Sequence, residues 1–201
     1  SKSVFSRDAS SEDMAPLFFD ADGDGRLDLV VTSGSVEKKA GDQAYRDRLY
    51  LGKGEPGEFG SAYYLPGEAM SSSVAAAADV DRDGDLDLFI GGRVIPGKWP
   101  TSPGSRLYLN ESKPGEVKFV LASKDRAPGL EECRRATSAL WTDIDRDGWL
   151  DLIVTHEYGP VRVFANSLGK LRDVTGEIGL TKRTGIPIDT LKRFYVVRIS
   201  E

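Results

Sequence analysis

Short apolar stretches alternate with polar, glycine-containing segments along the chain. Three stretches rich in Leu, Val and Ile (LDLVVTSG, LDLFIGGR and LDLIVTHE) begin at Leu27, Leu86 and Leu150. Their composition is typical of β-strands. A second short apolar run with small residues precedes each of them: DMAPLFF, VAAAADV and ATSALWT. The pattern therefore predicts pairs of short strands and little helix, with at most a turn or two of helix within residues 128–140.

Further along each unit, apolar and polar residues alternate, break at a Gly-containing turn and resume. These segments are residues 48–60, 106–120 and, in a shorter version, 161–175. Alternation around such a turn is typical of a β-hairpin. Each unit is thus expected to run strand, loop, strand, connector, strand, turn, strand. The connectors 35–47 and 93–105 are long and polar, so we expect them on one rim of the array.

Four short antiparallel strands in each of several repeated units predict the blades of a β-propeller. We expect an all-β fold, a β-propeller or propeller fragment, with blades at approximately residues 13–65, 74–121 and 137–180. Residues 181–201 would form a tail, with one extra strand at most. A closed propeller needs at least four blades. Either blades of a larger propeller are missing or chains self-associate, because an open array exposes sheet edges and an apolar end face.

The loop within each unit carries a nine-residue aspartate pattern: DADGDGRLD, DVDRDGDLD and DIDRDGWLD. The three copies begin at Asp20, Asp79 and Asp143, which are 59 and 64 residues apart. In D-x-D-x-D-G-x-x-D, positions 1, 3, 5 and 9 offer carboxylates, position 7 offers its carbonyl, and Gly at position 6 permits the chain reversal. The predicted ligands of three Ca²⁺ ions are Asp20, Asp22, Asp24, Arg26 and Asp28; Asp79, Asp81, Asp83, Asp85 and Asp87; and Asp143, Asp145, Asp147, Trp149 and Asp151.

An EF-hand, a magnesium site and simple acidic turns are the alternatives to a calcium loop. An EF-hand shares the first six positions but needs Glu at position 12 and flanking helices. Position 12 is Val31, Ile90 or Val154 here, each in a strand-like run. Magnesium rarely fills an all-protein cage. Simple acidic hairpin turns remain an alternative, although threefold repetition of one spacing disfavours them.

Composition narrows the class of protein. Hydrophobic residues make up 39% and charged residues 29% of the 201 residues, as in a soluble globular protein. The net charge of −5 disfavours nucleic-acid binding. No apolar run approaches the ~18 residues of a membrane helix, and no signal peptide is visible in this chain. The single Cys133 excludes an internal disulfide framework and a thiolate metal cluster.

Few residues outside the aspartate loops are candidates for a catalytic or ligand-binding site. His156 is the only histidine, which leaves little material for a His-based catalytic site. We expect it to be structural, and we expect Cys133 to be a bystander rather than a reactive thiol. Trp141 and Trp149 are expected to pack, whereas Trp99, on a long connector, is the candidate for ligand contact. The basic residues of the tail are expected to form a solvated face; they are Lys182, Arg183, Lys192, Arg193 and Arg198.

The loops and the RLYLN-type strand resemble the FG-GAP/VCBS repeats, whose blades also occur in integrin α-subunit propellers. The segments GGRVIPGKWP and LRDVTGEIGL are similar to those of the bacterial ASPIC/UnbV–CRTAC group. The resemblance implies a calcium-binding propeller that is secreted, periplasmic or at the cell surface, with an adhesive or ligand-binding role. We therefore expect a non-enzymatic module that binds a protein or glycan. A glycan-active enzyme using Glu131, Glu132 or Glu157, and a purely structural propeller segment, remain alternatives.

Overall fold

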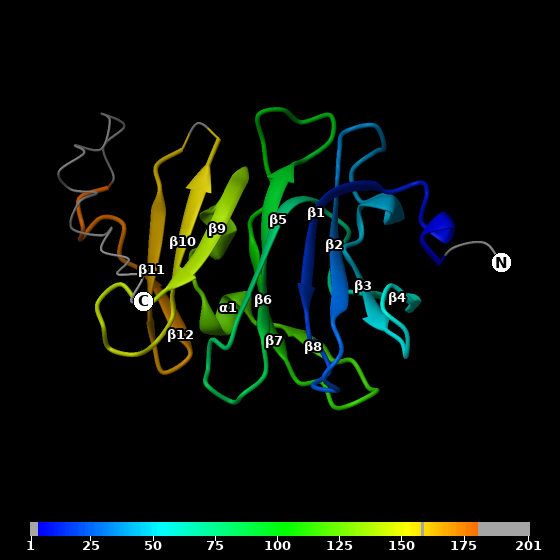
Figure 1. Ribbon diagram of the computed structural model, residues 1–201. Helices are drawn as coiled ribbons and strands as arrows, with labels where there is room; N and C mark the ends of the chain where they lie inside the picture. Colours follow the sequence, from blue (N-terminus) through cyan, green and yellow to red (C-terminus); the bar gives the residue numbers. More distant parts are fainter. Residues whose placement is uncertain (1–3, 158, 181–201) are drawn as a thin grey trace, which may run out of the picture.

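The computed structural model describes residues 4–157 and 159–180, which form three four-stranded antiparallel sheets side by side (Figure 1). We call them blades 1, 2 and 3. Blade 1 contains β1 (Glu12–Phe19), β2 (Asp28–Gly34), β3 (Arg48–Gly52) and β4 (Phe59–Tyr64). Blade 2 contains β5 (Ser71–Ala78), β6 (Asp87–Val94), β7 (Arg106–Asn110) and β8 (Phe119–Leu121). Blade 3 contains β9 (Ala136–Thr142), β10 (Asp151–His156), β11 (Arg162–Ser167) and β12 (Lys170–Asp173).

Strands that follow one another in the chain are neighbours in every sheet, as in propeller blades. The all-β prediction is confirmed. The helical pieces are short: η1 (Val4–Arg7), η2 (Gln43–Tyr45), α1 (Ser123–Arg126) and η3 (Leu130–Glu132). The helix expected within residues 128–140 amounts to η3, a single 3₁₀ turn, after which the chain enters β9. The predicted tail, residues 181–201, lies outside the described residues.

The first strands of the blades lie closest to the neighbouring sheets. Strand β5 packs against β1 and β2 on one side and against β9 on the other. Its sequence, SSSVAAAA, has small side chains that allow this close approach. At Gly91 in β6, an added Cβ would lie 2.6 Å from Val74 Cγ1 and 2.7 Å from Ala136 Cβ. Glycine is therefore required where β6 passes between the two inner strands.

Two apolar cores fill the spaces between the blades, and β6 supplies both. Leu88 and Ile90 point into the core between blades 1 and 2, with Val30, Leu49 and Tyr108. Phe89 points the other way, because successive strand residues face opposite sides of a sheet. It enters the core between blades 2 and 3, whose members include Leu107, Leu130, Leu152, Val154 and Phe164.

A smaller cluster lies on the outer face of blade 1. It contains Leu29, Val31 and Tyr50. The 3₁₀ turn η1 lies over it, with the ring centroid of Phe5 5.0 Å from that of Tyr50. The N-terminal segment thus covers the face of blade 1 that points away from blade 2.

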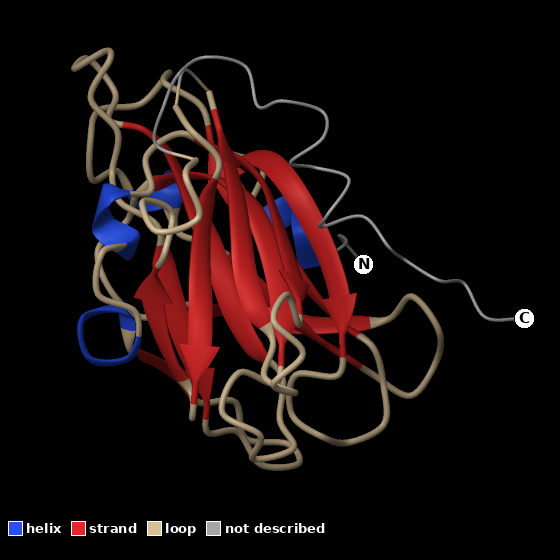
Figure 2. Cartoon of the chain, turned by 90° about the vertical axis from the view of Figure 1, so that its left-hand side faces the viewer, coloured by secondary structure: helices blue, strands red, loops and turns tan. Residues whose placement is uncertain are grey.

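The loops sort to two ends of the array. The loops that join the first and second strands of each blade, which carry the aspartate patterns, gather at one end, and the connectors lie at the other (Figures 1 and 2). In the part of the chain that is described, no helix is long and apolar enough to cross a membrane.

Candidate metal centre

The three acidic loops share one backbone path. Glycine at position 6 has a positive φ in each loop, at 85°, 100° and 90° for Gly25, Gly84 and Gly148. Position 4 is also left-handed, at 71°, 60° and 67° for Gly23, Arg82 and Arg146. Left-handed residues on alternating positions curl the chain tightly. The loop therefore turns back on itself between its first and its ninth residue.

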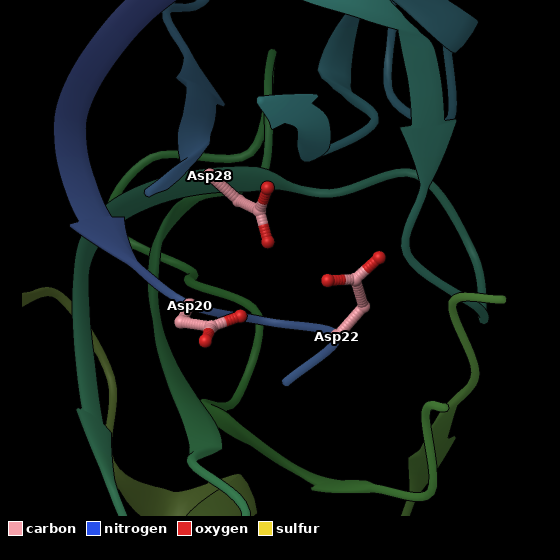
Figure 3. A group of neighbouring side chains, drawn as sticks. All are labelled: Asp20, Asp22 and Asp28. Carbon is pink, nitrogen blue, oxygen red and sulfur yellow. The ribbon is translucent and has the colours of Figure 1, made fainter. Parts of the chain in front are cut away.

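This path brings three carboxylates together in each loop, those of positions 1, 3 and 9. In every group the possible ligand atoms lie within 4.8 Å of one another. Figure 3 shows the first group, in which Asp20 and Asp22 from the loop and Asp28 from the start of β2 surround a common space. The groups are Asp20, Asp22 and Asp28; Asp79, Asp81 and Asp87; and Asp143, Asp145 and Asp151.

The aspartate at position 9 anchors each group. One carboxylate oxygen accepts a hydrogen bond from the backbone N–H of position 2, and the other accepts one from the third strand of the blade. The donors are Ala21 and Gly52 for Asp28, Val80 and Asn110 for Asp87, and Ile144 and Asn166 for Asp151, at 2.7–2.9 Å. The loop and the third strand are thus held in one fixed relation by a single side chain.

Burial of these carboxylates is electrostatically costly without a counter-charge. Burial raises the pKa of Asp87 to about 7, and nearby Asp81 and Asp83 add to the effect. Burial likewise raises the pKa of Asp28 and of Asp151, for which the other loop carboxylates are again secondary causes. A cation among the carboxylates would offset both the desolvation and the mutual repulsion.

The second loop contains buried oxygens that lack a partner. Asp79 Oδ1 and Asp81 Oδ1 are buried and form no hydrogen bond with any described residue. Buried polar atoms are almost always paired, so two unpaired carboxylate oxygens in one cluster are suited to receive a cation. All the donors are carboxylate oxygens, which suit a hard cation. The residues therefore fit a metal ion, and the three Asp-rich clusters could each hold one.

The aspartates at position 5 lie outside these groups. Asp24, Asp83 and Asp147 each accept a hydrogen bond from the backbone N–H two residues further on, at 2.9, 3.0 and 2.8 Å. Asp24 also forms an ion pair with Arg26. The structure thus brings together three of the four predicted carboxylates in each loop. The roles predicted for position 5, and for the carbonyls of Arg26, Asp85 and Trp149, stay predictions.

Two asparagines that the sequence analysis did not single out connect the loops of neighbouring blades. Asn110 Nδ2 donates to the Ala21 carbonyl in the first loop, at 2.9 Å, and to Leu86 in its own loop, at 3.1 Å. Asn166 Nδ2 repeats this with Val80 and Leu150, at 2.9 and 3.0 Å. Both side chains are buried. The sequence signal was the asparagine that ends LYLN in blade 2 and VFAN in blade 3. Blade 1, which has no preceding blade in the described residues, has Gly52 at this position.

The tryptophans have different environments. Trp141 packs against the core between blades 2 and 3 and donates from Nε1 to the Ala76 carbonyl at 3.3 Å. The Arg82 guanidinium lies 4.5 Å from the ring centroid of Trp149, so this contact also crosses between two loops. Trp99 is 62% exposed, with the Arg135 guanidinium 5.7 Å from its ring centroid.

Cys133 and His156 have structural surroundings. Cys133 is fully buried, and burial raises the pKa of its thiol to about 12, so the thiol stays protonated at neutral pH. His156 is the last residue of β10, and its Nδ1 lies 2.9 Å from the Pro160 carbonyl. Burial lowers the pKa of His156.

At the end of the array opposite the acidic loops, the two long connectors flank an open pocket of about 510 Å³. Tyr45 comes from the first connector, and Ile95 and Pro103 come from the second. Met70, Glu68 and Arg106 add to a lining that mixes apolar residues with one acidic and one basic residue. The connectors therefore form a concave surface between blades 1 and 2.

Comparison with known proteins agrees with this architecture. The family model of the FG-GAP-like repeat matches residues 20–90, from the start of the first acidic loop into β6. The chain therefore contains an FG-GAP-like repeat over residues 20–90, as its resemblance implied. A search of the curated proteins gave no match. The finer resemblance to the ASPIC/UnbV group stays a prediction.

Proposed function

We propose that this chain is a non-enzymatic, calcium-binding propeller module that presents its connectors to a protein or glycan ligand. The observation that carries the proposal is the threefold recurrence of a carboxylate group at equivalent places in three blades. Recurrence in every blade supports a structural role for the metal, because a catalytic site needs to be built only once. The ion would stabilise the loop against carboxylate repulsion.

Calcium fits the sites better than magnesium. Calcium accepts six to eight oxygen ligands at flexible geometry, whereas magnesium prefers octahedral geometry and keeps several waters. In each loop, the carboxylates of positions 1, 3 and 9 would hold the ion, with positions 5 and 7 available to add ligands. Calcium sites of this kind suit an extracellular, periplasmic or cell-surface location, where calcium is abundant, and this is the location we propose.

The pocket between the connectors is the surface on which a ligand would be expected. It is concave, combines apolar side chains with Arg106, and lies away from the metal loops, so that the ions support the blades without blocking it. Apolar side chains beside a guanidinium group suit a glycan or a peptide. Trp99, on the same connector as Ile95 and Pro103, is exposed and is a second candidate for ligand contact.

The enzyme alternative has less support. It required a carboxylate pair among Glu131, Glu132 and Glu157. Glu132 binds Arg162 at 3.0 Å, and Glu131 accepts a hydrogen bond from the Gly129 N–H at 3.1 Å, which are contacts typical of structural residues. We therefore propose a binding role rather than glycoside hydrolysis.

Thermal unfolding in calcium and in EGTA tests the metal part of the proposal. A ligand at about 1,000 times its Kd stabilises the folded state by about 4 kcal/mol per site, so EGTA should lower Tm by several degrees or more. The variant Asp79→Asn should lose part of this calcium-dependent gain. Asp85→Asn is the matched control, because it changes the same charge in the same loop but keeps the position 7 carbonyl.

A Tm that EGTA leaves unchanged would contradict the calcium proposal. Equal effects of the two variants would also contradict it, since only Asp79 belongs to the carboxylate group. For the ligand, a glycan array and a glycosidase screen on the calcium-loaded protein separate binding from catalysis. Turnover of a glycan would overturn the non-enzymatic assignment, and binding weakened by Arg106→Ala would support the connector pocket.

A further inference from the structure

The two long connectors lie at the same end of the array but carry different charge. In the first, residues 35–47, three basic residues are balanced by three acidic ones. The second, residues 93–105, contains Arg93 and Lys98 and no acidic residue. It forms the loop between β6 and β7, away from the acidic loops (Figure 1). The second connector is therefore a local source of uncompensated positive charge.

Two arginines that precede β9 lie beside this connector. Arg134 is paired with Gly92, at the end of β6, in an isolated β-bridge. The backbone N–H of Arg135 donates to the Ser102 hydroxyl at 3.0 Å. The fold thus brings basic residues from two distant segments to one surface between blades 2 and 3. We call this surface the basic rim, and its members are Arg93, Lys98, Arg134 and Arg135.

The charges of the basic rim are not neutralised by neighbouring side chains. Within residues 4–157 and 159–180, no member of the rim forms an ion pair. Arg162 of blade 3 differs, because its guanidinium lies 3.0 Å from both Glu132 and Asp173. Arg134 is exposed. Like charges that gather without counter-charges repel one another and attract anions, so the rim is suited to an anionic ligand.

An exposed aromatic ring adjoins the basic rim. Trp99 is 62% exposed, and the Arg135 guanidinium lies 5.7 Å from its ring centroid. Arg135 is fixed there, since Nη1 donates to the Pro100 carbonyl and Nε donates to the Glu157 carbonyl at 3.2 Å. Its Nη2 forms no hydrogen bond with any residue that the structure describes. The ring offers a flat apolar face for stacking, and the guanidinium beside it offers a donor for a carboxylate.

A small pocket of about 300 Å³ opens beside the two arginines of the rim. Its lining contains Arg134 and Arg135. Of its two acidic residues, Glu132 is neutralised by Arg162, which leaves Glu157 against the two arginines. The volume is at the small end of the range for ligand sites. The pocket therefore suits one ring of an anionic sugar better than a large apolar group.

We propose that the basic rim and Trp99 together bind an acidic glycan that contains uronate sugars. One sugar ring stacks on Trp99, and its carboxylate binds Arg134 and Arg135. Further carboxylates along the glycan contact Arg93 and Lys98. An acidic peptide would satisfy the charges but lacks a sugar ring to stack on the exposed indole. The surface is separate from the pocket between blades 1 and 2, so it can fail while the binding role proposed above stands.

Titration calorimetry of the full chain with a hyaluronan hexasaccharide, in which every second sugar is a glucuronate, tests the proposal. The methyl ester of the same hexasaccharide lacks the charges and should bind at least about tenfold more weakly. Trp99→Ala and Arg134→Ala should each weaken binding of the acid about tenfold, which corresponds to about 1.4 kcal/mol. Lys39→Ala is the matched control, because it removes one positive charge from the first connector at the same end of the array. It should leave the affinity nearly unchanged.

Equal affinity for the acid and its methyl ester, or no binding of either, would overturn the proposal. Equal weakening by Arg134→Ala and Lys39→Ala would also overturn it, because it would indicate attraction by net charge alone. Binding of hexaglutamate that is tighter than that of the hexasaccharide, and that Trp99→Ala leaves unchanged, would show that an acidic peptide is the partner. Both charge variants should keep the native Tm, and Trp99→Phe, which keeps a flat ring, should bind better than Trp99→Ala.

Discussion

At equivalent positions, one interface between blades has a carboxylate and the other has a hydroxyl group. Between blades 1 and 2, the fully buried carboxylate of Asp47 accepts hydrogen bonds from the Ser33 N–H and the Ser72 hydroxyl, at 2.8 and 2.9 Å. Between blades 2 and 3, Ser105 occupies the equivalent place. Its hydroxyl accepts from the Gly92 N–H at 3.2 Å and donates to the Cys133 carbonyl at 2.7 Å.

A hydroxyl bridges blades 2 and 3 where a carboxylate bridges blades 1 and 2, so a hydrogen-bonded link between blades requires no charge. Burial raises the pKa of Asp47 to about 7, although its hydrogen bonds oppose this shift. One interface is therefore sensitive to pH in a way that the other is not.

The largest effects are expected from truncating side chains in the two cores. Adjacent residues of β6 contribute to different cores: Leu88 to the one between blades 1 and 2, and Phe89 to the one between blades 2 and 3. Phe89→Ala should cost about 3–5 kcal/mol and Leu88→Ala about 2–5 kcal/mol, through lost contacts and the cavities left behind. Denaturant unfolding measures the totals. Hydrogen exchange should show faster opening of β10 and β11 in Phe89→Ala, and of β2 and β3 in Leu88→Ala.

If both variants accelerated exchange in the same strands, the two interfaces would open as one cooperative unit and not separately. The exposed Leu168→Ala is the control for loss of a large aliphatic side chain without loss of core, because Leu168 is 73% exposed.

The next effect concerns pH. The pKa of Asp47 is higher in the folded state than the unfolded value near 3.8, so the folded state keeps its proton longer. Its contribution to stability is fully present below about pH 3.8 and is lost as pH rises towards about 7. The loss is at most about 4 kcal/mol, at 1.36 kcal/mol per pH unit. The free energy of unfolding of Asp47→Asn, minus that of the native chain, should therefore rise across this window.

Ser105→Ala is the matched control for the other interface. It removes the bridging hydroxyl, so it should destabilise the protein by a similar amount at every pH. A flat difference between Asp47→Asn and the native chain from pH 4 to pH 7 would contradict the raised pKa.

A smaller effect is expected from the asparagines that connect neighbouring loops. Asn110→Ala and Asn166→Ala each leave one buried and one partly buried carbonyl without this donor, at a cost of about 1–3 kcal/mol. Because the two side chains make the same pair of bonds, their costs in denaturant unfolding should agree within about 1 kcal/mol. Asn110→Asp keeps the shape but places a carboxylate beside carbonyls, so it should cost more than Asn110→Ala. The reverse order would contradict a donor role.

The smallest perturbation uses Cys133 as a reporter of the interface between blades 2 and 3. The thiol is buried and protonated, so iodoacetamide should modify it slowly in the native chain. The rate should rise more in Phe89→Ala than in Leu88→Ala, even at equal global stability. Rapid modification of the native chain would mean that this interface opens freely.

Much of the architecture was predictable because its signals are local. Alternation of apolar residues marked the strands, and the aspartate spacing marked the loops, since both depend on residues close in sequence. The contacts between blades were not predictable in this way. Asn110 reaches a carbonyl 89 residues away, and Asp47 is an ordinary polar connector residue until Ser72 of the next blade packs over it. The hydrogen bonds from backbone N–H groups to the position 5 aspartates were not predictable either, because the spacing of the aspartates does not specify them.

The small side chains of β5 have a geometrical consequence for the whole array. Blade 2 has small side chains at Ala75–Ala78 in β5 and the large Phe119 in β8, so it is wedge-shaped, and wedges stacked by their faces curve around an axis. The size of the inner residues therefore sets the angle between successive sheets. Valines in place of these alanines would open that angle and change how many wedges complete one turn.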